Sequence, residues 1–309
     1  MSMQTAKSGK KRRDYNSISL PANLIWNGIF ILCCLTCIIP ILLVVVVSFT
    51  DEITLLRNGY SFFPELLSTS AYEYIFKKGG AVINAYGITL LVTIVGTVCS
   101  TLTIALYAYP LSRSNFAYKK FFTTFAFITM LFSGGLVPWY IIYTQVIGIG
   151  NTLAILIIPY LMNTWYMMIM RTFYKSTIPE ELLESARIDG AGEIRTFFSI
   201  VLPLSTAGIA TVALFSMLAY WNDWYLPLIF IRDDKLYNIQ YLMKAMLENA
   251  QFLARMSSQV AGASISVKDL PSETMRMAIA VVAIGPIVLA YPFFQRYFVK
   301  GLTIGAVKG

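Results

Sequence analysis

The stretch ESARIDGAGEIRTFFSIVLP, residues 184–203, is a polar interruption between two long apolar runs of this 309-residue chain. Gly190 and Gly192 predict a break in its middle, because glycine adopts tight or left-handed turns without steric cost. Glutamates precede the break and suit the positive end of a helix. We therefore predict two short helices joined by a glycine turn, which form a projecting knob.

The residues just before this stretch predict where the first helix begins. Thr177-Ile178-Pro179-Glu180 has the spacing of a capping box, with threonine as N-cap and glutamate three positions later. The first helix should then run to about residue 189 and the second over residues 193–201. Residues 176–203 are called the two-helix loop below.

The chain around this loop is unusually apolar, with 57% hydrophobic and 13% charged residues, against about 25% charged in a soluble domain. Six apolar runs reach the ~20 residues that a membrane-spanning helix needs. They cover residues 24–49, 82–109, 121–143, 153–173, 206–231 and 277–298. The first run is longer than the ~7–15 apolar residues of a cleaved signal peptide. The sequence predicts an all-α integral membrane protein with six transmembrane helices over residues 24–309.

Basic residues orient these spans. With both ends in the cytoplasm, 15 of the 24 lysines and arginines fall inside, as the positive-inside rule requires. The cytoplasmic parts are then the basic tail at residues 1–23, the two-helix loop and the tail at residues 295–309. This topology explains the net charge of +8, so no nucleic-acid partner is predicted.

Several kinds of chemistry are excluded by composition. The chain has no histidine, which removes histidine metal ligands and histidine-activated nucleophiles. All four cysteines lie in apolar runs, so they do not form a secreted disulfide framework. We interpret them as small buried residues of spanning helices, and no metal site is predicted. The cysteines are Cys33, Cys34, Cys37 and Cys99.

The outer loop at residues 232–275 contains a second helical pattern. Leu242, Met246, Leu253 and Met256 recur at helical spacing, which predicts an amphipathic helix. A flexible stretch at residues 261–266 should follow. The helix either caps the bundle or offers a docking surface to an outside partner.

A polar-aromatic group in the fifth run is the candidate substrate pathway. Asp223 is the one carboxylate inside a predicted span, where a charged group costs ~2.5–3.5 kcal/mol and usually faces a cavity or a partner. Its neighbours Trp221, Asn222 and Trp224 suit a sugar, since aromatic rings stack on it and amides bond its hydroxyls. The alternative is an aromatic belt at the membrane interface, with Asp223 already in water.

Other polar or small residues within the runs have plainer interpretations. Thr93, Gly96, Ser100 and Thr103 form a small-residue stripe that favours helix packing. Pro159 and Asn163 either kink the fourth span or line a cavity.

The pattern Glu184-Ser185-Ala186-x3-Gly190-x9-Ile200-x-Leu202-Pro203 resembles the Glu-Ala-Ala loop of ABC importer permeases, with serine in place of the first alanine. Residues 186–190, 221–223 and 295–301 resemble the carbohydrate branch. The chain is similar there to the smaller permease of maltose-type importers, oligosaccharide group, with a MetI-like fold. The similarity covers residues 81–309.

This resemblance implies a bacterial cell-membrane permease for a carbohydrate, working by alternating access in a heterodimer with a second permease. Two cytoplasmic ATPase subunits and an external solute-binding protein complete the importer. The chain would be non-catalytic and hold no cofactor, because ATP and Mg²⁺ would bind to the ATPases. Its own sequence lacks the Gly-x4-Gly-Lys-Ser/Thr phosphate loop.

The resemblance also assigns the contact with the ATPase to the two-helix loop. Glu184 would pair with a basic group, Ser185 and Ala186 would allow close approach, and Gly190 would form the turn. The full set of implied coupling residues is Glu184, Ser185, Ala186, Asp189, Gly190, Ala191, Ile200, Leu202 and Pro203.

Two alternative functions stay open at this point. An ABC importer for peptides or amino acids would share the two-helix loop. A secondary transporter would need coupling-ion carboxylates within its spans or paired broken helices. The presence of one intramembrane acid and the lack of a clear internal repeat argue against it.

Overall fold

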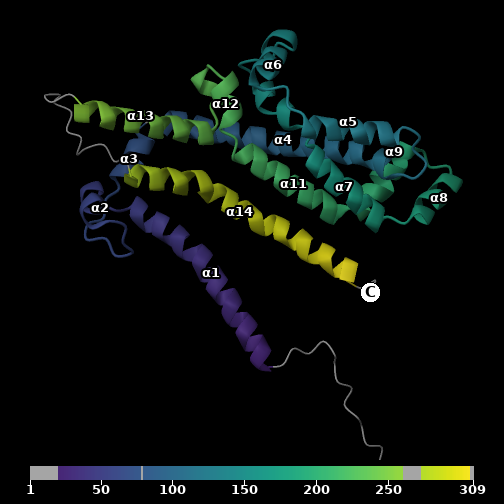
Figure 1. Ribbon diagram of the computed structural model, residues 1–309, viewed down its shortest axis with the longest axis horizontal. Helices are drawn as coiled ribbons and strands as arrows, with labels where there is room; N and C mark the ends of the chain where they lie inside the picture. The colour runs from purple at the N-terminus through teal and green to yellow at the C-terminus, as the bar shows by residue number, and fades with distance from the viewer. Residues whose placement is uncertain (1–19, 78, 260–272, 307–309) are drawn as a thin grey trace, which may run out of the picture.

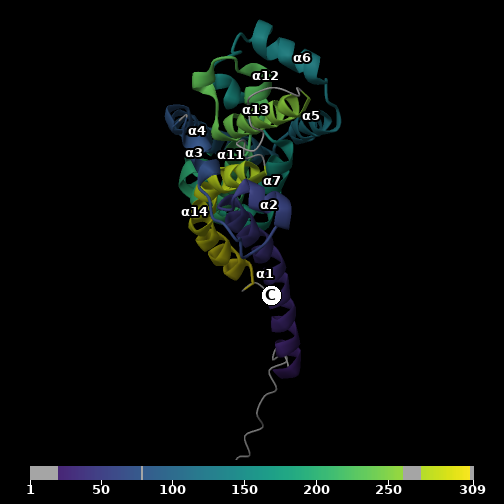
Figure 2. The ribbon, with the colours of Figure 1, turned by 90° about the vertical axis from the view of Figure 1, so that its left-hand side faces the viewer.

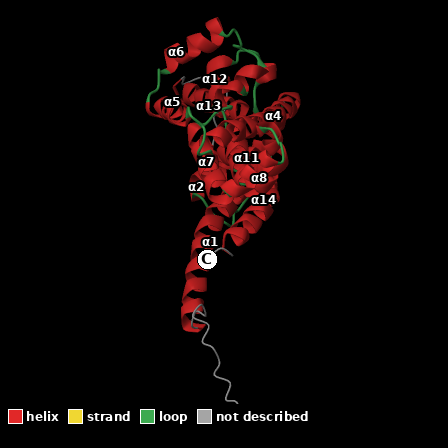
Figure 3. Cartoon of the chain, turned by 90° about the vertical axis from the view of Figure 1, so that its right-hand side faces the viewer, coloured by secondary structure: helices red, strands yellow, loops and turns green. Residues whose placement is uncertain are grey.

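A computed structural model describes residues 20–77, 79–259 and 273–306. In these ranges the regular elements are helices, and one isolated bridge pairs Thr50 with Leu67 (Figure 3). The first half contains α1 Leu20–Ser48, α2 Glu52–Asn58, α3 Ser70–Phe76, α4 Gly79–Ser112, α5 Lys119–Leu131, α6 Leu136–Ile141, η1 Ile142–Val146, η2 Leu153–Leu156 and η3 Ile158–Tyr160. The second half contains α7 Thr164–Thr177, α8 Glu180–Ile188, α9 Glu193–Thr196, η4 Phe197–Val201, α10 Leu202–Leu204, α11 Thr206–Trp221, α12 Tyr225–Phe230, η5 Asp234–Leu236, α13 Ile239–Gln259 and α14 Glu273–Ala306.

Helix breaks divide three of the apolar runs. Among the described residues, α1 and α4 are each long and apolar enough to cross a membrane, and up to five spans result if three bent helix pairs count as one span each. The third run breaks between α5 and Leu136–Val146 at 115°, where Gly135 takes a φ of 85°. The fourth bends by 50° before α7, and the third bent pair joins Glu193–Leu204 to α11 at 84°. The fifth run also stops at Trp221 before the short α12. Glycine conformation and polar capping residues cause these breaks, which hydrophobicity alone does not reveal.

Helix α4 is the central element. It packs along α7 and α11, and α11 packs on α14 (Figure 1). The two-helix loop lies at one end of this assembly and α13 at the other. Polar contacts agree with this arrangement. Asn84 near the start of α4 donates a hydrogen bond to the carbonyl of Lys235, whereas Arg113 just beyond its end forms an ion pair with Glu180 of α8. Helix α1 packs on α14, and its N-terminal end projects away from the rest of the chain (Figure 2).

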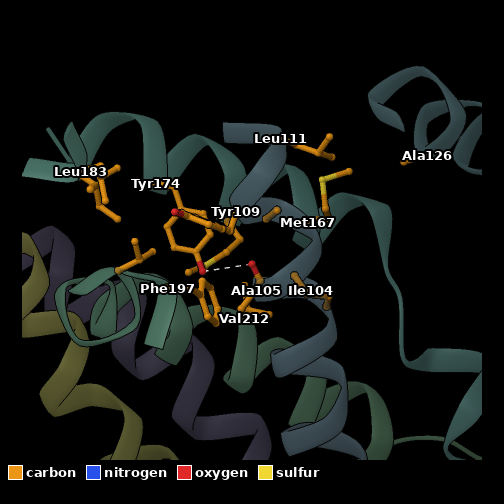
Figure 4. Packing of buried hydrophobic residues seen from close by; sticks show 14 residues of the cluster. Ile104, Ala105, Tyr109, Leu111, Ala126, Met167, Tyr174, Leu183, Phe197 and Val212 are labelled. Atoms are coloured by element: carbon orange, nitrogen blue, oxygen red, sulfur yellow. Dashed lines mark hydrogen bonds between the residues drawn. The ribbon is translucent and has the colours of Figure 1, made fainter. Parts of the chain in front are cut away.

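The largest apolar core lies where α4, α7, α8 and α11 meet (Figure 4). Met167 and Met170 of α7 are fully buried in it, whereas Trp165 is exposed. The Tyr174 hydroxyl, also buried, donates to the carbonyl of Ala105 at 3.4 Å. This core fixes the base of the two-helix loop to the long helices. Because close-packed interiors transmit strain, a displacement of the loop is passed on to those helices.

Small residues on α4 mediate helix packing at Gly96 and Ser100, as predicted, whereas Thr103 is exposed and its hydroxyl donates to the carbonyl of Cys99 in the same helix. Gly96 faces the ring of Tyr220, so closely that an added Cβ would lie 2.6 Å from the ring carbon Cζ. Ser100 Oγ lies 3.3 Å from Ser216 Oγ of α11.

The predicted capping box at the two-helix loop is wrong. Thr177 is the last residue of α7, Pro179 is the N-cap residue of α8, and no side chain caps that helix. Helical backbone is sterically disfavoured for the residue before a proline, and Ile178 is extended and separates the two helices. Glu180 instead accepts a hydrogen bond from Ser114.

The predicted burial of the cysteines is also wrong for this chain by itself. All four cysteines are exposed. Three of them lie on α1, whose apolar window has no side chain buried within the described residues. The amphipathic helix of the outer loop is confirmed as α13, with Leu242 and Met246 packed in a core. The stretch 261–266 lies outside the described residues.

Candidate functional site

The two-helix loop turns at Gly190, which takes a φ of 76°. The amide of Ala191 donates to the carbonyl of Ala186 at 2.9 Å, and that of Gly190 donates to the carbonyl of Arg187 at 3.0 Å. This pair of bonds is a Schellman motif, which ends a helix on a left-handed glycine. The predicted glycine turn is confirmed. It sets the angle between the two arms of the loop, which are α8 on one side and the segment from α9 to α10 on the other.

A side-chain network connects the two arms to the membrane-spanning core. Arg187 of α8 donates from Nε and Nη2 to Glu193 Oε1, at 3.2 and 2.7 Å. The other oxygen of Glu193 accepts from the Tyr109 hydroxyl of α4 at 2.8 Å. The hydrogen bond from Tyr109 and the bond and charge of Arg187 together hold the pKa of the Glu193 carboxyl below its usual value. One ionised carboxylate therefore joins three helices.

Apolar residues anchor the inner side of the loop and leave its outer side uncovered. Leu183 of α8 and Phe197 at the start of η4 are buried in the main core. Ile188 and Ile194, on either side of the turn, are 86% and 78% exposed. Two large apolar side chains are therefore left exposed on either side of the turn.

A groove of ≈ 380 Å³ runs between the two arms. It contains five of the nine residues that the resemblance implied: Ser185, Ala186, Asp189, Ala191 and Ile200. Glu184 and Gly190 lie on the exposed surface of the loop, and Leu202 and Pro203 lie in α10, where the second arm leads to α11. Ala186 is buried within this chain. Its small side chain therefore acts inside the loop.

Sequence reasoning missed the network of Tyr109, Arg187 and Glu193. Arg187 and Glu193 offered a weak signal, as opposite charges placed on either side of a glycine turn. Tyr109 offered none, because it is 84 residues from Glu193 and lies in an apolar run.

A second candidate site is a cavity of ≈ 500 Å³ where α11 ends. It lies between η3, the start of α7 and the segment after α11. Its lining combines aromatic, amide and hydroxyl side chains with one carboxylate and a few apolar residues. The lining residues are Pro159, Tyr160, Met162, Asn163, Tyr166, Ser216, Ala219, Tyr220, Asn222, Asp223, Trp224 and Tyr225.

Asp223 holds the broken helix together at this cavity. It is only 7% exposed, and its Oδ1 accepts from the amides of Tyr225 and Leu226 at 3.0 and 3.2 Å. The Tyr160 hydroxyl donates to the same oxygen at 3.1 Å. The carboxylate thus caps α12 and joins it to η3, as buried charges require hydrogen-bond partners.

The four pathway candidates separate into two groups. Asn222, Asp223 and Trp224 line the cavity. Trp221 points elsewhere, because its indole N–H donates to the carbonyl of Ala283 in α14 at 3.0 Å. Trp224 is partly exposed, and Lys244 Nζ of α13 lies 4.4 Å from its ring centroid. Helix α13 therefore touches the edge of the cavity.

Asn163 both breaks the fourth run and lines this cavity. Its Oδ1 accepts from the amides of Trp165 and Tyr166 and so begins α7. Its two N–H donors take no part in that cap. A cavity with amide donors, phenol hydroxyls and an indole face can bind a polyhydroxylated ring. No group of three or more metal-binding side chains occurs in the described ranges.

Comparison with known proteins identifies the family. Residues 101–304 match the family described as binding-protein-dependent transport system inner membrane component. The chain is 32% identical over 282 residues to the polygalacturonan/rhamnogalacturonan transport system permease protein YtcP of Bacillus subtilis, covering 91% of this chain and 96% of that protein. It is 29% identical over 280 residues to the arabinooligosaccharides transport system permease protein AraQ of Halalkalibacterium halodurans, covering 88% and 91%.

A solved structure shares the fold. It is a crystal structure of a bacterial ABC transporter involved in the import of the acidic polysaccharide alginate, with a TM-score of 0.70 and 24% identity. The match covers 89% of this chain and 95% of that one. In agreement with the resemblance of the two-helix loop, this chain belongs to the family of inner membrane components of binding-protein-dependent transport systems.

Proposed function

We propose that this chain is the permease subunit of an ABC importer for a carbohydrate, most specifically an oligosaccharide. The observation that carries the proposal is the rigid connection of the two-helix loop to the long helices through Tyr109, Glu193 and Arg187. A displacement of such a loop by a partner moves the helices as a body, which is how alternating access works. Relatives named as permeases for polygalacturonan/rhamnogalacturonan and for arabinooligosaccharides support the solute class.

The proposed topology has six spans, with both termini and the two-helix loop in the cytoplasm. The broken third, fourth and fifth spans and the continuous α14 each supply one crossing. The distribution of lysine and arginine supports this orientation. The separation of the two-helix loop and α13 at opposite ends of α4 is consistent with it (Figure 1).

The proposed partners follow from the surfaces that this chain leaves open. A second permease would pair with it, and two ATPase subunits would bind ATP and Mg²⁺ and receive the two-helix loops. Glu184, Ile188 and Ile194 provide a charged and an apolar contact on the exposed face of the loop. A solute-binding protein would approach the side of α13. The chain itself catalyses no reaction in this scheme.

The cavity beside Asp223 is proposed as the part of the pathway that touches sugar. Trp224 offers a ring face, and Asn222 and Asn163 offer amide groups. Asp223 would hold the walls of the cavity in place rather than bind solute. Its Oδ1 already accepts three hydrogen bonds, from the Tyr160 hydroxyl and from two amides at the start of α12.

Uptake by the reconstituted importer tests the proposal. The chain is assembled in proteoliposomes with its second permease, ATPase and binding protein, and ATP-dependent uptake of labelled oligosaccharides, amino acids and peptides is measured. Saccharide uptake supports the proposal. Uptake of a peptide or amino acid, with no saccharide transported, would reject the solute class.

Two tryptophan variants test the cavity. Trp224→Ala should lower saccharide uptake about tenfold, which corresponds to losing ~1.4 kcal/mol of solute interaction. Trp165→Ala is the matched control, because Trp165 is exposed and lies outside the cavity. Equal uptake by the two variants would remove the cavity from the pathway.

A further inference from the structure

A basic cavity of ≈ 390 Å³ lies on the two-helix-loop side of the molecule, next to the loop but separate from its groove. It opens between the end of α4, the start of α5, the end of α7 and the start of α8. Three cations line it, Arg113, Lys119 and Lys175, with Glu180 as the one acid in its lining. The cavity therefore carries an excess of positive charge.

Arg113 is the most deeply placed of these cations. Its side chain is 12% exposed, and its Nε is buried without a hydrogen-bond partner in the described part of the chain. Nη2 lies 3.9 Å from Glu180 Oε1, a distance beyond hydrogen bonding, and the guanidinium lies 5.8 Å from the ring centroid of Tyr109. A buried guanidinium N–H without an acceptor is costly unless a ligand supplies one.

The neighbouring lysine shows the same excess of charge. Lys119 Nζ donates to the carbonyl of Arg113 at 2.9 Å, which brings the ammonium to the cavity. Burial first, and then the charges of Lys175, Arg171 and Arg113, lower the pKa of Lys119, while Glu180 opposes them. An anion in the cavity would relieve this repulsion.

The segment that carries Lys119 into the cavity also carries exposed aromatic side chains. Tyr118 precedes α5, Phe121 and Phe125 lie in its first turns, and all three side chains are exposed. Phe121 and Phe125 stack with ring centroids 6.5 Å apart. Lysine and arginine gather at the cytoplasmic ends of membrane-spanning helices, so in the proposed orientation a basic cavity at the start of the apolar helix α5 is within reach of lipid phosphates.

We propose that this cavity binds the phosphodiester of an anionic lipid headgroup, with Arg113 and Lys175 as its charged donors and acyl chains along the aromatic surface of α5. The planar fork of arginine suits phosphate oxygens, and basic pockets on the cytoplasmic side of helix bundles bind anionic headgroups. The inference uses the membrane orientation of the proposed function and is independent of the solute.

A lipid bound here would support the two-helix loop. Arg113 faces both Tyr109, which holds Glu193, and Glu180, which begins α8. A phosphate in the cavity would fix Arg113 in place and thereby steady the base of the first arm.

The test measures lipid binding to the full-length chain by native mass spectrometry in detergent. Phosphatidylglycerol is titrated against phosphatidylcholine, with inorganic phosphate in large excess as a separate arm. Arg113→Gln and Lys175→Gln should each weaken phosphatidylglycerol binding about fivefold. Lys120→Gln is the matched control, because Lys120 is an exposed lysine of α5 that follows Lys119 but does not line the cavity, and it should change binding less than twofold.

Three results would overturn the proposal. These are equal binding of phosphatidylglycerol and phosphatidylcholine, equal losses in Lys175→Gln and Lys120→Gln, and displacement of the lipid by inorganic phosphate, which would identify a soluble anion as the ligand. The thermal midpoint of each variant controls for misfolding, and Arg113→Lys is a second control because it keeps the positive charge. If Arg113→Gln does not fold, Lys175→Gln decides the outcome. Saccharide uptake is measured separately, so a failure of this site is distinguishable from a failure of the transport function.

Discussion

The Tyr109 hydroxyl donates a 2.8 Å hydrogen bond to Oε2 of Glu193, joining a long apolar helix to the projecting two-helix loop. The other oxygen of Glu193 holds Arg187 of the opposite arm. Removing one group from this contact changes how the loop is held without changing the surface that a partner would meet. The contact therefore separates coupling from docking.

Tyr109→Phe should reduce transport several-fold while ATP hydrolysis by the assembled importer continues. The substitution deletes a hydrogen bond to a charged group, worth about 1.5–3 kcal/mol, and leaves the bond between Arg187 and Glu193. The ratio of uptake to ATP hydrolysed is the measurement. Tyr118→Phe, which alters an exposed tyrosine of the adjoining segment, should keep the normal ratio; an unchanged ratio in Tyr109→Phe would show that this contact does not transmit motion.

The stability of the loop should depend on acid pH through Glu193. Its native pKa lies below the usual value, so its carboxylate stabilises the fold above about pH 4.3 and loses this contribution as the pH falls through the native pKa. The thermal midpoint is measured between about pH 3 and 7. Glu193→Gln should lie below the parent at neutral pH and converge with it in acid; parallel curves would contradict the assignment.

Gly190→Ala should destabilise the two-helix loop by roughly 1–2 kcal/mol, because a side chain is strained at a φ of 76°. Transport should fall with it. Gly192→Ala is the matched control two residues later, since Gly192 has a φ of −71° and open space at its Cβ. Gly190→Pro, which cannot adopt a positive φ, should abolish transport with membrane insertion intact. Equal behaviour of the two alanine variants would argue against the turn as the sensitive element.

Glu184→Lys should abolish transport without affecting membrane insertion, because it reverses a charge on the exposed face of α8. Glu181→Lys, an exposed residue one turn earlier, is the control for charge alone. Co-purification with the ATPase and coupled ATP hydrolysis are measured. Full coupling in the Glu184→Lys importer would exclude Glu184 from the ATPase contact.

Gly96→Ala should destabilise the packing of α4 on α11 by about 1–3 kcal/mol, the cost of overfilling a close contact. The added Cβ would lie 2.6 Å from a ring carbon of Tyr220. Gly87→Ala, on the same helix with open space around it, should be neutral or slightly stabilising. Thermal midpoints in detergent distinguish the two; a stable Gly96→Ala would mean that the Tyr220 ring moves freely.

Local rules made several features predictable. Apolar runs indicated a membrane protein, and helical spacing at Leu242 and Met246 indicated α13. The glycine turn at Gly190 followed from backbone sterics. The capping box failed because two local signals competed at Thr177 and Pro179, and the steric effect of proline on Ile178 prevailed.

The roles of single polar residues were less accessible. Asp223 was a candidate for a pathway or for an aqueous interface, yet its carboxylate is buried and caps α12. Trp221 and Trp224, three residues apart, serve different surfaces. A helix break that hydrophobicity does not record separates them.

Short-range patterns in the sequence were enough to establish the membrane class, the glycine turn and the motif that points to the transporter family, because each depends on residues close together in the chain. The folded chain was needed to show that Tyr109 holds Glu193, that Asn163 and Asn222 share one cavity, and that Arg113, Lys119 and Lys175 surround another. These contacts join segments far apart in the chain. Their existence depends on how the helices pack and where they break, which no short-range pattern specifies.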